Sequence, residues 1–141
     1  MILLEIGLAY VYSHLLEYYA HKFLHRFKKK NQPLAFHLRE HHVQAWRNNM
    51  LDTPSFREAA LLGGVALLHS PLLLLSPAAF WTLVLCAMSY LYVHYRSHMD
   101  IRWAMDNLPW HVDHHLGNQQ ANWGVRRDWI DRLLGTRKPS K

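Results

Sequence analysis

Ten of the twelve histidines in this chain fall into four short clusters. Histidines spaced three or four residues apart share one face of a helix, and neutral imidazole is the commonest metal ligand in proteins. Ten imidazoles exceed what one ion can use, but they suit two ions with five nitrogens each, or fewer with positions left open for water or oxygen. The sequence therefore predicts a two-metal site. Its expected ligands are His21 and His25, His37, His41 and His42, His94 and His98, and His111, His114 and His115.

The expected ligand set is rich in nitrogen and free of thiolate, because Cys86 is the only cysteine. Such a set suits Fe, Zn, Cu or Ni and disfavours Ca and Mg. Ligating histidines are usually held from behind by a second polar group that accepts a hydrogen bond from the ring. The residues expected in this supporting role lie near the clusters in sequence. They are the carboxylates Glu17, Glu40, Asp100, Asp106 and Asp113, together with His14 and Asn122.

One short motif suggests a different class of function. His37, Glu40 and His41 form the pattern H-x-x-E-H, in which two histidines bind zinc and the glutamate serves as general base. A zinc-binding membrane hydrolase is therefore the alternative from another enzyme class, although it leaves most of the clustered histidines without a role. His69 lies outside all the clusters, and we expect it to be a satisfied core or interfacial residue.

A long uncharged stretch sets the expected architecture. No Asp, Glu, Lys or Arg occurs from Ala59 to Tyr95, and Ser76-Pro77 interrupts this run near its middle, as expected for a helical hairpin that enters a membrane. With 141 residues, the chain is expected to form a single domain, 1–141. The expected helices are Ile2–Phe27, Pro33–Asn48, Ser55–Leu75, Pro77–His98, Pro109–Leu116 and Arg126–Leu134, with a loop at Gly117–Gly124.

The basic residues predict an orientation in the membrane. The net charge is +6, and the basic side chains flank the apolar segments but are absent from the hairpin turn. By the positive-inside rule, all four histidine clusters then face the cytoplasm. The basic residues do not form a continuous stripe with interleaved aromatics, so nucleic acid is not an expected partner. We expect an all-α, integral-membrane helical bundle with a cytoplasmic polyhistidine two-metal site, located in a bacterial-type inner membrane.

Several segments resemble the fatty acid hydroxylase superfamily of integral-membrane enzymes, which also includes sterol desaturases. The resemblance covers nearly the whole chain, and its closing motifs lie outside the histidine clusters. Ile130 departs from it, because the family usually has Trp there. The matching segments are Glu17–Arg26, Tyr90–His98, His111–His115, Asn122–Val125 and Asp131–Thr136.

The resemblance implies a di-iron oxygenase that hydroxylates a C–H bond of a lipid acyl chain or similar hydrophobic substrate with O₂. Desaturation, or hydroxylation of a sterol or carotenoid, is the alternative within the superfamily. Electrons would come from a separate ferredoxin- or cytochrome-type donor, since we expect no fused cytochrome domain. A second copy of the short chain could complete the substrate tunnel. Zinc binds the same nitrogens, so zinc in these positions would be compatible with an iron enzyme.

Overall fold

The computed structural model describes residues 1–53 and 55–139, and all regular structure within them is helical. The prediction of an all-helical fold is therefore confirmed for this part of the chain. The elements are α1 (Ile2–Leu24), the π-helix η1 (His37–His42), α2 (Val43–Arg47), α3 (Phe56–Leu68), α4 (Leu72–Leu75), α5 (Pro77–Met99), α6 (Ile101–Asn107), α7 (Pro109–Val112), the π-helix η2 (Asp113–Gly117) and α8 (Trp129–Leu133).

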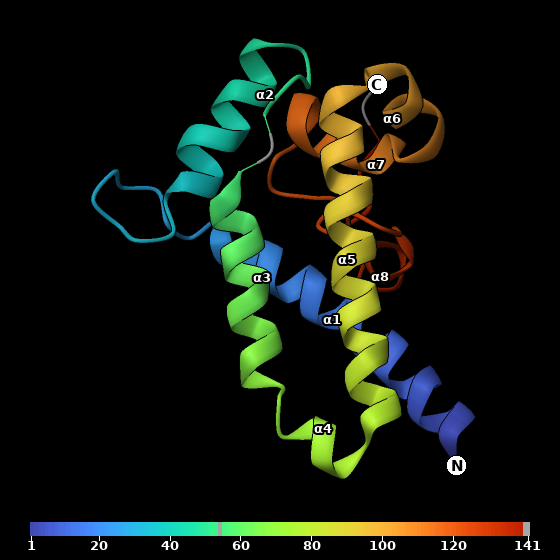
Figure 1. The fold of residues 1–141 in the computed structure, drawn as a ribbon. Helices are drawn as coiled ribbons and strands as arrows, with labels where there is room; N and C mark the ends of the chain where they lie inside the picture. The colour runs from blue at the N-terminus through green and yellow to red at the C-terminus, as the bar shows by residue number, and fades with distance from the viewer. Residues whose placement is uncertain (54, 140–141) are drawn as a thin grey trace.

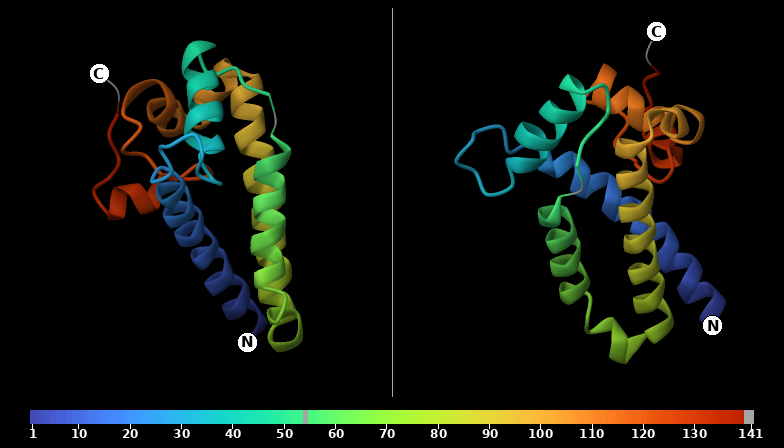
Figure 2. Two further views of the ribbon diagram at one scale, coloured as in Figure 1. Left: turned by 90° about the vertical axis from the view of Figure 1, so that its left-hand side faces the viewer. Right: turned by 45° about the horizontal axis from the view of Figure 1, so that its top comes forward.

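Three long helices form the frame of the molecule. Helices α3 and α5 are the arms of a hairpin that turns through α4, and α1 crosses this hairpin and packs chiefly on α5 (Figure 1). The N-terminus and the hairpin turn lie toward one end, whereas α2, α6, α7 and the C-terminal segment gather at the other (Figure 2). The topology thus collects both π-helices and the short helices α2, α6 and α7 at one end of the frame, whereas the short α4 lies in the hairpin turn at the other.

The first arm of the hairpin is shorter than expected. The sequence predicts one helix over Ser55–Leu75, but α3 ends at Leu68 and a separate turn of helix, α4, follows. Pro71 explains the break, because proline has no N–H to donate and disfavours helical backbone in the residue before it. Ser55 caps the start of α3, where its Oγ accepts a hydrogen bond from the backbone of Arg57.

Other boundaries also differ from the expected ones. Helix α1 ends at Leu24 rather than Phe27, and the segment expected as one helix over Pro33–Asn48 is a π-helix followed by the short α2. Helix α6 was not expected; Asp100 caps it by accepting a hydrogen bond from the backbone of Trp103 at 3.0 Å. Within the expected helix Arg126–Leu134, only Trp129–Leu133 is helical.

Both π-helices contain a pair of adjacent histidines, His41-His42 in η1 and His114-His115 in η2. A π-turn is wider than an α-turn and is found mostly at functional sites. The expected short helix at Pro109–Leu116 is therefore divided into α7 and η2. The irregular backbone is concentrated where the histidines are, not in the long helices.

One helix among the described residues, α5, is long and apolar enough to cross a membrane. Only 11% of its most apolar window is buried inside the protein, so most of its apolar surface faces outward. Large apolar side chains are also exposed along α1, α3 and α4, among them Leu3, Leu67 and Leu74. A continuous apolar exterior of this kind is typical of a surface that contacts lipid or another protein.

Candidate metal centre

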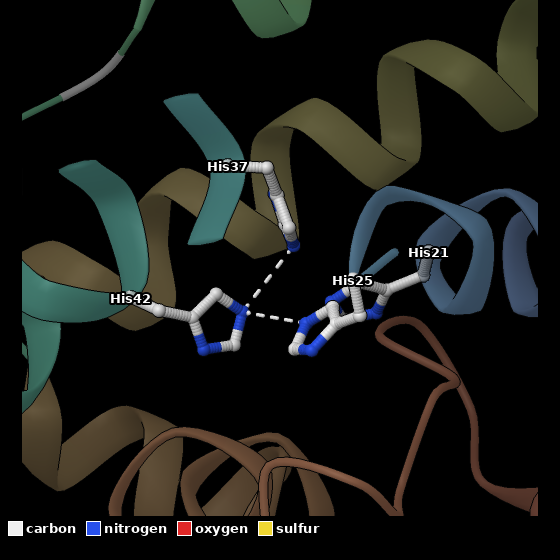
Figure 3. Close-up of side chains that lie close together, drawn as sticks. All are labelled: His21, His25, His37 and His42. Carbon is white, nitrogen blue, oxygen red and sulfur yellow. Dashed lines mark hydrogen bonds between the residues drawn. The ribbon is translucent and has the colours of Figure 1, made fainter. Parts of the chain in front are cut away.

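The ten clustered histidines converge at the end of the frame where the short elements meet, and all ten are buried. Ring positions divide them into two adjoining groups of five. Group A contains His21, His25, His37, His42 and His114, and group B contains His41, His94, His98, His111 and His115. Within each group, four histidines have ligand nitrogens within 4.8 Å of one another. Figure 3 shows four members of group A, whose rings point toward a common centre.

The fifth member of each group is placed by its ring contacts. The His114 ring centroid lies 4.5 Å from that of His21 and 4.8 Å from that of His42. In group B, His111 Nε2 lies 3.2 Å from His98 Nε2. The groups touch where the rings of His42 and His115 stack, with centroids 4.2 Å apart. Each adjacent histidine pair therefore supplies one ring to each group.

The nitrogens that face the centres fit a bound cation. His25 Nε2 lies 3.1 Å from His42 Nε2, which in turn lies 3.3 Å from His37 Nε2. Neighbouring ligands around an ion with bonds of about 2.1 Å would also lie about 3 Å apart. Further buried ring nitrogens, such as Nε2 of His21 and of His114, have no hydrogen-bond partner. Metal ions would satisfy these nitrogens. Groups A and B offer only imidazole donors, and a third set that could hold an ion, His37, His41 and Glu58, adds one carboxylate.

The opposite ring nitrogens are held by acceptors from the surrounding chain. His21 Nδ1 lies 2.8 Å from the carbonyl oxygen of Trp123, and His114 Nδ1 lies 2.6 Å from that of Ala121. His98 Nδ1 lies 2.7 Å from the carbonyl oxygen of Met50. With these Nδ1 atoms donating, the Nε2 atoms are left free to bind a metal.

Two carboxylates also support the rings. His41 Nδ1 lies 2.6 Å from Asp52 Oδ2. Nδ1 of His94 and of His37 lie 3.0 and 3.6 Å from the two oxygens of Glu58, which are ion-pair distances without the alignment of a hydrogen bond. Neither residue was expected from the sequence, because each is at least ten residues away from the nearest clustered histidine along the chain. A usable signal was that Glu58 is the last charged residue before the long uncharged run.

Four of the five carboxylates expected in this role have other partners or are exposed. They are Glu17, Glu40, Asp100 and Asp106. Glu40 is exposed and forms an ion pair with Arg57. Its carboxylate is therefore not placed between His37 and His41, where a general base would have to lie. Asp113 pairs with Arg137, Asp100 caps α6 and Asp106 is exposed. Glu17 is buried but contacts the C-terminal segment instead of a histidine. It accepts hydrogen bonds from the backbone N–H groups of Val125 and Arg126 and pairs with the Arg126 guanidinium.

His14 and Asn122 also do not contact the clustered rings directly. His14 is buried between Tyr10 and Trp129. Asn122 has a positive φ of 58°. Its side chain joins two stretches of the C-terminal segment, because it accepts a hydrogen bond from the backbone N–H of Lys138 and donates one to the Lys138 carbonyl. His69, the other unclustered histidine, bonds the Tyr12 hydroxyl and the Val65 carbonyl, as expected of a satisfied residue.

The C-terminal segment from Ala121 to Lys138 forms a clasp over group A. Asp131 accepts hydrogen bonds from the N–H groups of Trp123 and Gly124 and from the Thr136 hydroxyl. A Cβ at Gly124 would lie 2.2 Å from the carbonyl oxygen of Arg127, so this position requires glycine. The clasp fixes the two carbonyl groups that hold His21 and His114. The closing motifs of the sequence therefore support the site from outside it.

Burial lowers the pKa values of several clustered histidines and so favours their neutral form. It lowers the pKa of His37 to about 4 and that of His114 to about 3, and the pKa values of His42, His111 and His115 are also well below the ordinary value. Desolvation is the main cause, and the neighbouring histidines lower the pKa values further. Neutral imidazole is the form that binds metal, so the rings are ready to bind at neutral pH.

An apolar cavity adjoins the centre. It lies between α1, α3 and α5 and has a volume of about 120 Å³. His21 and Glu58 line it where it meets the histidines, and His69 and Phe80 line it near the hairpin turn. Most of the remaining wall is aliphatic, with the buried Glu17–Arg126 pair as its main charged feature. The cavity is suited to an apolar chain that reaches the metal centre from within the frame.

Comparison with known proteins supplies the family. The family model described as fatty acid hydroxylase matches residues 6–136. No curated protein and no solved structure gives a match. The match includes every clustered histidine, most of each cavity-lining helix and all but the last two residues of the clasp, and it covers far more than half of the chain. The chain belongs to the fatty acid hydroxylase family.

Proposed function

We propose that this protein is an integral-membrane di-iron oxygenase that hydroxylates a C–H bond of a lipid acyl chain or a similar hydrophobic substrate. The observation that carries the proposal is the arrangement of ten buried imidazoles in two groups of five beside an apolar cavity. The family is one of oxidoreductases of the hydroxylase and desaturase type, and it is membrane-associated. Iron is favoured over other nitrogen-binding metals by the family, not by the donor set alone.

The ten histidines would hold the two ions, group A one and group B the other. When bound, the irons supply the reduction of O₂ and the removal of hydrogen from carbon. The protein itself holds the rings. Trp123, Ala121 and Met50 accept hydrogen bonds through their carbonyl groups, so that His21, His114 and His98 keep Nε2 available.

The cavity would bind and orient the substrate. Aliphatic residues of α3 and α5, such as Leu61, Val65 and Val84, offer contacts that a hydrocarbon can fill. Burial of such a chain removes apolar surface from water and keeps water away from the reacting carbon. Because His21 lies in the cavity wall, a carbon at that end of the chain comes next to group A.

The membrane position follows from the exterior of the molecule. The exposed apolar faces of α1, α3 and α5 would contact lipid, and the basic residues Lys28, Lys29 and Lys30 are exposed in the loop that follows α1. By the positive-inside rule, we expect the metal centre to face the cytoplasm from a bacterial-type inner membrane, where a soluble ferredoxin- or cytochrome-type electron donor could reach it.

Lipid mass spectrometry of cells that express the chain tests the function. We expect a lipid that has gained one oxygen atom with the parent chain and not with His111→Ala. Glu40→Gln, a change at an exposed carboxylate, serves as the matched control and should give the same product as the parent. A lipid that has lost two hydrogen atoms would instead mean desaturation. If the parent and His111→Ala give the same lipids, the oxygenase proposal is wrong.

A further inference from the structure

Glu58 is the one carboxylate in the described part of the chain that lies beside both groups of histidines. One of its oxygens is 3.6 Å from Nδ1 of His37, a member of group A, and the other is 3.0 Å from Nδ1 of His94, a member of group B. The side chain is only 6% exposed. Asp52, by contrast, contacts a single ring, that of His41.

The ring geometry assigns these contacts to the sides that face away from the centres. His37 Nε2 points toward the other nitrogens of group A, 3.3 Å from His42 Nε2, so its Nδ1 is the nitrogen that faces Glu58. For His94, Nδ1 likewise faces Glu58, and the buried Nε2 has no hydrogen-bond partner. Each ring therefore turns Nδ1 toward the Glu58 carboxylate and leaves Nε2 for a metal ion.

We propose that Glu58 is a positioning residue shared by the two metal sites, one carboxylate that orients a ligand of each ion. A carboxylate behind a ligating histidine fixes the tautomer and makes the ring a stronger donor. Because both rings depend on the same side chain, the loss of Glu58 weakens both sites together. This inference rests on the proposed binding of one ion by each group, but not on the reaction or its substrate.

The position of Glu58 in the chain supports the assignment. It lies in the first turn of α3, just after the Ser55 cap, and Tyr95 of α5 donates a hydrogen bond to the Ser55 carbonyl at 2.9 Å. These contacts fix the start of α3 against α5, the helix that carries His94. The same carboxylate lines the apolar cavity, where few other groups are polar.

The test is a Co²⁺ titration of the purified, metal-free protein, followed by the absorption of the bound ion. In Glu58→Ala we expect both binding steps to weaken by about 10–100-fold, the usual effect of losing such a support. In Asp52→Ala only one step should weaken, and in Glu40→Ala neither should. Added acetate should restore both steps in Glu58→Ala, whereas acetamide should not, because a carboxylate can accept from two N–H groups.

Glu58→Gln provides a second measurement that holds even if the alanine variant folds poorly. The amide has one acceptor oxygen, so it can serve one ring, while its NH₂ group faces an N–H of the other. One binding step should therefore stay near its parent affinity and the other should weaken. The inference is overturned if Glu58→Ala weakens only one binding step, or if acetate does not restore binding in that variant. It is also overturned if Glu58→Gln binds both ions like the parent. Complete loss of one ion in a Glu58 variant would overturn it as well, because that is the result expected of a direct ligand. Failure of the oxygenase proposal would appear separately, as unchanged lipids with normal Co²⁺ binding.

Discussion

Groups A and B have the same number of rings but different supports. In group A, His21 and His114 are held by neutral backbone carbonyls of the C-terminal clasp. In group B, His41 is held by the Asp52 carboxylate and His98 by the Met50 carbonyl, both from the segment between α2 and α3. The two ligand sets, although equal in number, therefore depend on different parts of the chain for the hydrogen-bond acceptors that hold their rings. An ion bound by group B would also be more electron-rich, because Asp52 adds a charged acceptor that has no counterpart in group A, whereas Glu58 lies behind one ring of each group.

The adjacent pair His41-His42 gives the sharpest test of this division and the largest expected effect. His42→Ala should remove one ion, from group A, and His41→Ala should remove the other, from group B, because the two rings point to different centres. Both variants should lose product formation. Co²⁺ spectra measure which site remains, and the two variants should retain different spectra. Identical residual spectra would mean that the ten rings form one undivided site.

Gly124→Ala should weaken group A alone, with a smaller effect. The added Cβ would meet the Arg127 carbonyl at 2.2 Å, so the clasp must shift, at a cost of about 1–3 kcal/mol in the free energy of unfolding. The Trp123 carbonyl would then move away from His21. Gly64→Ala in α3, where a Cβ meets nothing within 4 Å, is the matched control. Equal weakening of both metal-binding steps in Gly124→Ala would contradict the separate support of group A.

Acid should destabilise the metal-free protein. His37 and His114 have folded-state pKa values of about 4 and about 3, below the ordinary 6.5, so between pH 6.5 and these values the unfolded chain binds protons that the folded chain does not. The free energy of unfolding is therefore unaffected by these groups above pH 6.5. It falls as the pH decreases, by up to about 1.4 kcal/mol per pH unit for each histidine. Thermal unfolding in detergent at pH 7.5 and pH 5 measures this, and equal Tm values would exclude neutral buried rings.

Glu40→Gln should have the smallest effect. The Glu40–Arg57 pair is exposed, and such pairs contribute at most about 1 kcal/mol to stability. We expect unchanged metal binding and unchanged product formation. A large loss of activity in this variant would revive the zinc hydrolase alternative, in which Glu40 is the general base. The result therefore decides between the two enzyme classes through one surface residue.

Much of the fold was predictable from the sequence, because it depends on local pattern. The long uncharged run and the Ser76-Pro77 break predict the hairpin, and the α5 boundaries differ from the prediction by one residue at Met99. The end of α3 at Leu68 was not predicted, because the apolar run continues through Pro71 and a single helix was expected from that run. The effect of proline on the helix backbone was not taken into account. The π-helices were missed because no simple residue pattern distinguishes them from α-helix.

The number of candidate histidine ligands was predictable from the sequence, but their arrangement in space was not. The ten histidines and their division between two centres follow from counting. The assignment of His41 and His42 to different centres depends on the direction of each ring, which the widened turn of η1 sets. The supporting groups depend on tertiary contacts between distant segments. Glu58 is sixteen residues or more from every clustered histidine in sequence, so proximity along the chain favoured the wrong carboxylates.

Because the clasp lies near the C-terminal end of the described residues, it is synthesised after most of the histidines that it supports. Val125 contacts Glu17 across 108 residues, so the first helix and the last segment of the described chain must meet before group A is supported. During synthesis, His21 and His25 emerge long before the carbonyls of Ala121 and Trp123 exist. While the chain is still being synthesised, the first histidines of group A therefore lack their supporting carbonyl groups. Group A could hold an ion stably only after the clasp has been made and has packed against α1.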